Sequence, residues 1–543
     1  MIAVGVLSRQ SSRTISDFTV GTRSASAWLS AFSYGTAYFS AVMFIGYAGS
    51  SGWEYGIWGV LPGIGNAIFG SLLAWMVLAN RTREVTRRLN IRSMPQLFEK
   101  RFGSGVMKQF CVFVIFIFLV PYSASVYKGL SSVCAVLLNV DEQLCMIIIA
   151  LAAAALVIFG GYVATLKADF LQGLIMIAGV IALIVVVFRS QQVGGLAEGL
   201  RSIVAETKAL ELDAQAHIGL WATVLMTSFG TWGLPQMVHK YYGIKDKAEV
   251  KRGIVISTLF ALIIAGGGYL IGSLSHLFFT ELPEKGTDYL VPNMLVTANL
   301  PNILLGVVLV LLISASVSTL ASITITASTT LTMDFLQAKL FKQMPQERAG
   351  LLAKVVSAAF IAVSYLIANT DTPILDMMSY SWGMISGSFM APYMISLYWR
   401  RLSRAGAWAG MLGGFLTACP PVVCKLFFPD ATTAFGKVAD LGPHFACLAM
   451  LVSIVLCLFV SLKSNIWNPE MECMSRPDME ALQLERLKAL VDYCDRNVAF
   501  YHKRLTKAGI SADKIKTLSD IQYIPYTTKN DLRDTYPFGM FSV

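Results

Sequence analysis

Long apolar segments alternate with short polar loops along most of the chain. Twelve of these segments come close to or exceed the roughly 20 residues that a helix needs to cross a bilayer. They cover residues 28–52, 56–80, 109–138, 144–166, 168–188, 218–240, 253–279, 303–333, 350–369, 374–398, 405–428 and 444–464. The pattern predicts an all-α polytopic membrane protein.

One segment, residues 307–335, differs from the others because hydroxyl side chains crowd its middle and its second half. These hydroxyls belong to Ser314, Ser316, Ser318, Thr319, Ser322, Thr324, Thr326, Ser328 and Thr329. At helical spacing, one face carries Ala315, Ser318, Thr319, Ser322 and Thr326. Hard oxygens of this kind replace the water shell of a small alkali cation. In the alternative interpretation, they bond to their own helix carbonyls or let neighbouring helices approach closely.

Composition and charge support the membrane interpretation. The 543 residues are 55% hydrophobic and 14% charged, and the mean hydropathy is +0.61. The net charge of +10 lies mainly in alternate loops, so we expect no nucleic-acid partner. The nine cysteines form no CxxC pair or His/Cys cluster, and we interpret them as small buried hydrophobic residues.

Lysine and arginine concentrate in every second loop, which indicates the orientation of the chain. The rich loops hold Arg9, Arg13, Arg23, Arg81, Arg83, Arg87, Arg88, Arg92, Lys100, Arg101, Lys108, Lys167, Lys240, Lys245, Lys247, Lys251, Arg252, Lys339, Lys342, Arg348, Arg400, Arg401 and Arg404. The alternate loops hold Arg189, Arg201, Lys208, Lys285 and Lys437. The positive-inside rule predicts that the rich loops are cytoplasmic, together with the chain before Trp28 and after Leu462. We therefore expect a multi-pass protein of the cytoplasmic (inner) membrane with a cytoplasmic C-terminal tail.

Two halves of the apolar region repeat one pattern. Ser33-Tyr34-Gly35-Thr36 opens a group of five segments at 28–188, and Ser228-Phe229-Gly230-Thr231 opens a second group at 218–398. Gly233 and Pro235 follow the second motif. Interrupted helices at matching positions of two halves are typical of transporters with inverted repeats and a midplane site. A broken helix exposes carbonyls that need a partner, and a cation is one such partner.

Three further polar or aromatic residues have two interpretations each. Lys128 lies well inside a segment, where an ammonium usually faces a cavity and contacts an anion, or else extends to the interface. Asp169 either attracts an exiting cation or caps a helix N-terminus. Trp232 either lines a substrate pocket or serves packing. The three glycines at 266–268 indicate close helix packing, because no Lys-Ser/Thr follows them as in a phosphate loop.

Three sequence blocks resemble the sodium:solute symporter family over residues from about 4 to 463. They are SDFTVGTRSASAWLSAFSYGTAYFSAVMFIGYAG at 16–49, GGYVATLKADFLQGLIMIAG at 160–179 and ASVSTLASITITASTTLTMDF at 315–335, and GLPQ at 233–236 supports them. The resemblance implies a leucine-transporter-like fold, a 5+5 inverted-repeat core with two C-terminal accessory helices. It also implies sodium as the coupling ion, without another cofactor.

The resemblance also implies positions for the ligands. Sodium would bind the carbonyls of Thr36, Phe39 and Ala315 and the hydroxyls of Ser318 and Thr319, and Asp169 would lie on the sodium path. The solute would lie beside this site, where the implied residues are Ser40, Met43, Ser228, Thr231 and Trp232. Lys128 joins this set because its ammonium suits a carboxylate.

The two ends depart from the family pattern. Residues 1–27 resemble the tail of a truncated first helix and a cytoplasmic loop, without a cleavable signal peptide. Residues 466–543 change to a charged composition and resemble the N-terminal segment of phenylacetate-coenzyme A ligases. There, Met479–Leu505 predicts an amphipathic helix and Thr528 a helix cap. The phosphate loop and the nucleotide site of those ligases do not follow, so we expect this fragment to be inactive.

These observations predict six parts of the chain. They are the tail and loop at 1–27, repeats at 28–188 and 218–398 joined by an extracytoplasmic linker at 189–217, two accessory helices at 399–465 and the ligase-like fragment at 466–543.

The expected function is sodium-coupled uptake of a small organic solute, with a monocarboxylate or aryl acid favoured by the ligase resemblance and proline or a sugar as alternatives. The expected partners are this solute, sodium and the bilayer, and the oligomeric state stays open. Rival hypotheses are a membrane-tethered acyl-coenzyme A ligase and a sodium-independent channel or sensor. A proton is a poorer coupling ion than sodium for a shell of hydroxyls and carbonyls that lacks a carboxylate.

Overall fold

The computed structural model describes residues 19, 23–283, 286–298, 301–370, 372–428, 433–463, 474–537 and 539–541. It divides into two units, Met1–Lys463 and Ser464–Val543, which are described separately below. The truncated helix expected from the first residues lies outside the described part of the chain.

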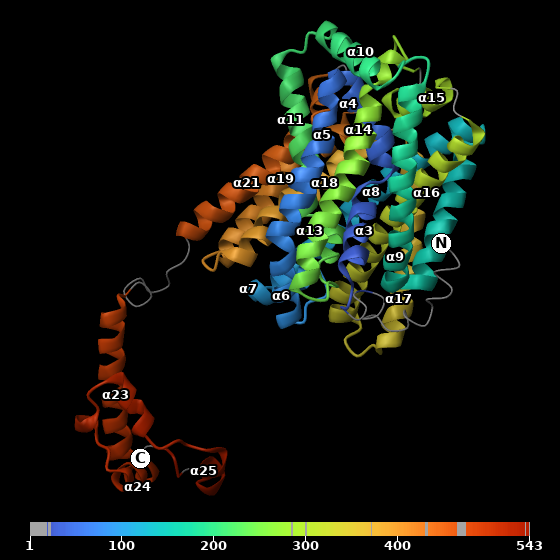
Figure 1. The fold of residues 1–543 in the computed structure, drawn as a ribbon. Helices are drawn as coiled ribbons and strands as arrows, with labels where there is room; N and C mark the ends of the chain where they lie inside the picture. The colour runs from blue at the N-terminus through green and yellow to red at the C-terminus, as the bar shows by residue number, and fades with distance from the viewer. Residues whose placement is uncertain are drawn as a thin grey trace. The chain divides into compact units, whose positions relative to one another are not determined.

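The first unit is built from helices (Figure 1). Its first half comprises α3 (Ala27–Tyr38), η2 (Val42–Tyr47), α4 (Ala48–Tyr55), η3 (Gly56–Val60), α5 (Leu61–Gly65), η4 (Asn66–Leu73), η5 (Trp75–Ala79), α6 (Asn80–Arg88), α7 (Met94–Phe102), α8 (Gly105–Leu138) and α9 (Glu142–Arg189). After α10 (Leu196–Ala209), the second half comprises α11 (Ala214–Phe229), η6 (Gly230–Trp232), α12 (Pro235–His239), α13 (Lys247–Ala261), η7 (Leu262–Gly266), α14 (Gly267–Ser273), η8 (Ser275–Leu277), η9 (Thr287–Tyr289), α15 (Leu290–Thr297), α16 (Asn302–Thr329), η10 (Thr330–Leu340), α17 (Gln346–Ala368) and α18 (Ile374–Tyr398). The last helices of this unit are α19 (Arg404–Phe427), α20 (Ala434–Ala439) and α21 (Gly442–Lys463).

Eight helical runs among the described residues are long and apolar enough to cross a membrane. They are fewer than the twelve predicted segments because residues 42–88 count as one run, Glu142–Ile158 is shorter, broken helices such as α11 and α12 are individually too short, and α18 is not among the eight. One predicted boundary is wrong. The chain breaks at Gly161 rather than at Lys167, because Gly161 adopts φ 62°, a conformation that other residues rarely tolerate.

The first interrupted helix breaks a few residues beyond the glycine of its motif. Helix α3 continues through Gly35 and ends at Tyr38, and Phe39 adopts an extended conformation with φ −102° and ψ 95°. Helical structure resumes at Val42 in η2. The last carbonyls of α3 therefore lack intrahelical donors, since the last four carbonyls of any α-helix do.

The second interrupted helix breaks where Gly230, Gly233 and Pro235 occur. Helix α11 passes into the tight turn η6, and α12 starts at Pro235. The hydroxyl of Ser386 in α18 donates to the Gly230 carbonyl at 2.5 Å. A neighbouring helix thus satisfies part of the backbone that this break exposes.

Helix α16 lies against both repeats. It contacts α3, α8 and α9 from the first repeat, and α12 and α17 from the second. Helices α18, α19 and α21 pack against one another, and α19 and α21 lie on the other side of the bundle from α16 (Figure 1). The hydroxyl-rich segment is therefore in contact with the ends of both broken helices.

The second unit contains α23 (Arg476–Asn497), α24 (Ala499–Ala508), η11 (Ala512–Lys514), η12 (Leu518–Tyr523) and α25 (Lys529–Asp534). The single helix predicted for Met479–Leu505 is wrong, because the chain leaves helical conformation at Val498, with φ −127°. The predicted cap is confirmed: the Thr528 hydroxyl accepts from the Asp531 amide. Val491, Leu505 and Ile515 form the small core of this unit.

The close approach of α4 and α14 supplies a test of this packing. A Cβ added at Gly52 would lie 1.9 Å from the Gly272 carbonyl oxygen. We expect Gly52→Ala to lower the unfolding temperature of the purified protein, since overpacking costs about 1–3 kcal/mol. The matched control is Gly306→Ala in α16, where an added Cβ meets nothing within 4 Å. Equal unfolding temperatures for the two variants would contradict this contact.

Candidate functional site

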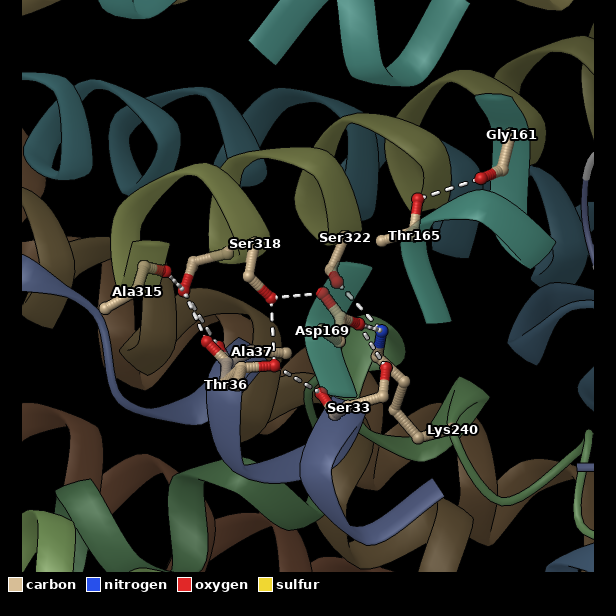
Figure 2. A network of polar contacts seen from close by, with 11 residues as sticks. Ser33, Thr36, Ala37, Gly161, Thr165, Asp169, Lys240, Ala315, Ser318 and Ser322 are labelled. Atoms are coloured by element: carbon tan, nitrogen blue, oxygen red, sulfur yellow. Dashed lines mark hydrogen bonds and ion pairs between the residues drawn. The ribbon is translucent and has the colours of Figure 1, made fainter. Parts of the chain in front are cut away.

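Polar side chains from α3, α9 and α16 converge at the broken end of α3, together with Lys240 at the end of α12 (Figure 2). Ser33, Asp169 and Ser318 have exposed fractions of 0%, and Lys240 is 3% exposed. The residues come from positions up to 285 apart in the sequence, so only the packed helices bring them together.

Thr319 closes the end of α3. Its hydroxyl oxygen lies 3.1 Å from the Thr36 carbonyl oxygen, 3.4 Å from that of Ala37 and 3.1 Å from that of Ala315. The hydroxyl has one hydrogen and can donate fully to only one carbonyl at a time. The other carbonyls keep lone pairs that are directed at the same small region, which is a suitable environment for a cation.

Asp169 holds the neighbouring hydroxyls. Ser318 donates to Asp169 Oδ1 at 2.5 Å, and Ser33 donates to Oδ2. The Ser318 oxygen also lies 2.9 Å from Thr36 Oγ1. Because a charge-assisted bond to the carboxylate is the stronger one, it takes the Ser318 hydrogen. The lone pairs of Ser318 are then directed away from Asp169, toward α3.

Lys240 is the partner of Asp169. Its Nζ lies 3.5 Å from Asp169 Oδ2 and donates to Ser322 Oγ at 2.8 Å. A buried carboxylate without a partner is strongly unfavourable at membrane depth. Asp169 lies inside α9, so it is not a helix cap, and its place on the sodium path stays a prediction.

The face of α16 predicted from helical spacing is the one that meets these groups. Ala315, Ser318 and Thr319 lie at the end of α3, Ser322 contacts Lys240, and Thr326 lines a cavity beside Lys240. Off this face, Ser328 and Thr329 bond back to carbonyls of their own helix. The back-bonding interpretation therefore holds for Ser328 and Thr329, whereas cation binding by the other face stays a prediction.

The structure brings together four of the five residues predicted to bind sodium: Thr36, Ala315, Ser318 and Thr319. Phe39 lies at the break itself, where its amide donates to the Gly35 carbonyl at 2.9 Å. The role of these residues in binding sodium stays a prediction. Their geometry gives a cation two side-chain hydroxyls and the unsatisfied end of a helix, whose dipole also favours positive charge.

Each residue predicted to line the solute site contacts a different partner within the protein. Ser40 caps the chain after the first break by accepting from the Val42 amide at 3.2 Å, and Met43 packs against Gly268. Ser228 donates to the Asn66 side chain at 3.2 Å, and the Thr231 hydroxyl donates to the Ser228 carbonyl.

The roles of Trp232 and Lys128 toward a solute stay predictions, and the structure gives the contacts of both side chains. The Trp232 indole donates to the Phe69 carbonyl at 3.0 Å and its ring packs against Phe229. Lys128 donates to the carbonyls of Thr370 and Thr372 at 3.0 and 2.9 Å, rather than to an anionic side chain.

Sequence reasoning missed two members of the site. Lys240 is counted above among the cytoplasmic loop charges, but it is buried against Asp169. Its position at the end of the predicted segment 218–240 is the signal that could have indicated this burial. Ser33 belongs to the repeated motif, but nothing in its local pattern indicates that it faces Asp169.

Comparison with known proteins identifies a family and several relatives that this chain resembles. The family model "Sodium:solute symporter family" matches residues 18–414. The osmoregulated proline transporter OpuE of Bacillus subtilis is 25% identical over 471 residues, covering 84% of this chain and 92% of the relative. The sodium/pantothenate symporter of Escherichia coli is 24% identical over 430 residues, covering 77% of this chain and 87% of the relative.

A solved structure establishes the fold. The substrate-bound, outward-open structure of a Na+-coupled sialic acid symporter superposes with a TM-score of 0.68 at 16% identity, covering 85% of this chain and 95% of that chain. The predicted fold class, a leucine-transporter-like helical core, is confirmed.

The buried pair Asp169–Lys240 yields a stability prediction. We expect Asp169→Ala to cost about 3–5 kcal/mol of unfolding free energy, because it leaves an ammonium buried without its partner. The double variant Asp169→Ala/Lys240→Met should recover part of this loss. The measurement is thermal unfolding of the purified full-length protein.

The control for this prediction is Arg252→Ala. Arg252 pairs with Glu249 at 2.9 Å, but its side chain is 72% exposed, so its removal should leave the unfolding temperature nearly unchanged. Strict additivity of the two single effects at Asp169 and Lys240 would contradict the pairing.

Proposed function

This chain belongs to the sodium:solute symporter family, and from that premise we propose that it takes up a small carboxylate-bearing solute together with sodium. The chain is a multi-pass membrane transporter and not an enzyme, since its relatives are transporters. We place the protein in the cytoplasmic membrane. The positive-inside rule supports an orientation in which the arginine-rich loops face the cytoplasm.

The observation that carries this proposal is the contact between the two alcohol side chains of α16 and the open end of α3. Ser318 and Thr319 reach Thr36 with oxygen–oxygen distances of 2.9 and 3.1 Å. A sodium ion between these oxygens would join α3 to α16. Sodium binding would then favour one arrangement of the two helices, which is positive coupling to the solute that binds the same arrangement.

The two sides of the first break suit charges of opposite sign. The carbonyl end of α3 favours a cation, whereas the chain that resumes at Ala41 presents amide hydrogens. The Ala41 and Val42 amides face only hydroxyl oxygens, at 3.4 Å from Ser316 Oγ and 3.2 Å from Ser40 Oγ. A carboxylate is a stronger acceptor for these amides than a hydroxyl. The break thus supports a site with sodium on one side and a solute carboxylate on the other.

The names of the relatives support the same chemistry. Proline, pantothenate and sialic acid all carry a carboxylate. Proline is the first solute to test. The proline transporter OpuE aligns with this chain over 471 residues, and the pantothenate symporter aligns over 430. The expectation of an aryl acid depended on the ligase resemblance of residues 466–543, which lie beyond the family match. That resemblance stays a prediction, and we propose no ligase activity for this unit.

The test is uptake of radiolabelled L-proline into vesicles that contain the protein, measured against sodium concentration. We expect Thr319→Ala to raise the sodium concentration for half-maximal uptake by roughly tenfold, because one ligand is worth about 1–1.5 kcal/mol. Ser318→Ala should act in the same direction. Substituting choline for sodium should abolish accumulation.

Ser328→Ala is the matched control on the same helix. Ser328 is buried and its hydroxyl bonds to the Thr324 carbonyl at 2.7 Å, away from the end of α3. Its sodium dependence should equal that of the unmodified protein. An unchanged sodium dependence in Thr319→Ala and Ser318→Ala would refute the ligand assignment, and solute accumulation without sodium would refute the coupling.

A further inference from the structure

Lys240 lies between two polar regions of the first unit. On one side, Asp169 and Ser318 lead to the end of α3 (Figure 2). On the other side is a cavity of about 10 Å³, lined by Lys240 with Tyr162, Gln236 and Thr326 among others. This volume is about that of one water.

The cavity contains polar atoms that lack protein partners. Both polar atoms of the Gln236 amide and the hydroxyl of Tyr162 have no hydrogen-bond partner among the described residues. Gln236 is 1% exposed and Tyr162 is 3% exposed. Buried polar groups of this kind require water or an ion, because an unmade hydrogen bond at such a position costs about 1–3 kcal/mol. The cavity is therefore suited to one water or to one small cation that has lost its hydration shell.

The cavity lies toward the arginine-rich end of the unit. Three residues beyond Lys240, the Gly243 carbonyl accepts from the Ala25 amide at 3.0 Å. Arg87 donates to the carbonyls of Arg23 and Ile244 beside this contact. A cation that moves from α3 past Asp169 and Lys240 is thus moving toward the end predicted to be cytoplasmic.

The contacts of Lys240 are those of a displaceable group. Its Nζ lies 3.5 Å from Asp169 Oδ2, longer than the roughly 2.7–2.9 Å of a tight charge-assisted bond. Its shorter contact, 2.8 Å, is to the neutral hydroxyl of Ser322. The ring of Tyr162 lies 5.9 Å from the ammonium and offers it a second favourable position next to the cavity.

Sodium and the Lys240 ammonium would compete for one carboxylate. Asp169 is one hydrogen bond from the predicted ligands through Ser318, at 2.5 Å. A sodium ion that leaves those ligands toward the cavity gains the attraction of Asp169 only as the ammonium withdraws. Conversely, the return of the ammonium lowers the affinity of Asp169 for the ion and promotes its release.

We propose that Lys240 is the inner gate of the sodium path. Its ammonium closes the way from the oxygens of α3 and α16 to the cavity at Gln236. When the ammonium pairs with Asp169 again, it expels the departing ion, so Lys240 is a positioning residue. This inference rests on the proposed sodium coupling. A purely structural Lys240 would only neutralise Asp169, and its loss would weaken every property of the site. A gate makes the opposite prediction for the sodium affinity, because the loss of Lys240 would leave sodium bound more tightly.

The experiment uses sodium alone as the probe, so it does not depend on the identity of the solute. Thermal unfolding of the purified full-length protein is followed at constant ionic strength while sodium replaces choline, which gives the apparent sodium affinity. We expect Lys240→Gln to bind sodium at least about tenfold more tightly than the unmodified protein, because Asp169 then has no internal competitor. Adding Asp169→Asn to this variant should remove the gain.

A milder variant covers the case in which Lys240→Gln does not fold. Ser322→Ala keeps every charge but removes the shorter contact of the ammonium, so we expect a sodium affinity about two- to fivefold higher. Lys240→Arg, which keeps the charge, should stay within about threefold of the unmodified protein. An unchanged or weaker sodium affinity in Lys240→Gln, or in Ser322→Ala where only that variant folds, overturns the gate.

Two outcomes separate the gate from the sodium coupling. If sodium raises the unfolding temperature of the unmodified protein but the variants show no higher sodium affinity, only the gate is overturned. If sodium changes the unfolding temperature of none of these proteins, the sodium coupling is overturned as well.

Discussion

Backbone groups inside a membrane must find partners within the protein, and this constraint organises the first unit. In the described part of the unit, one helix breaks after Tyr38 and its counterpart in the second half breaks between Phe229 and Pro235. Each break exposes carbonyls that water cannot solvate. Hydroxyls of α16 and α18 supply the donors, Thr319 at the first break and Ser386 at the second. The same requirement that makes the breaks possible therefore places alcohol side chains beside open carbonyls, and this is the chemistry of an alkali-cation site.

Electrostatics explains why a charged pair accompanies these neutral oxygens. The end of α3 and the Asp169 carboxylate are both negative, and together they would hold a cation too firmly for rapid release. Lys240 offsets this charge from the opposite side while its contact with Asp169 stays long, at 3.5 Å. The site thus combines attraction for a cation with an internal competitor. A transporter needs both properties, because it must bind its ion on one side and lose it on the other.

Much of the fold follows from local sequence alone. Apolar length predicts the helices, and the segment at 374–398 matches α18 residue for residue. Spacing along α16 predicts which hydroxyls share a face, because a helix repeats every 3.6 residues wherever it is packed. Glycine and proline predict the second break at 230–235. The first break was harder to locate: Gly35 remains helical and packs against Phe260, and the helix ends three residues later, at Tyr38. A glycine chosen for close packing and one chosen for a turn have the same local pattern.

The sequence by itself determined that this is a helical membrane protein with two repeats and a hydroxyl face on its eighth core segment. Only the tertiary structure decided what that face meets. The burial of Lys240 and the meeting of Ser33, Asp169 and Ser318 depend on packing between helices far apart in the chain. A lysine at the end of a segment has the same local pattern whether it points to water or inward. Asp169, 71 positions earlier, decides that Lys240 points inward, because a buried ammonium is stable only where a carboxylate lies next to it.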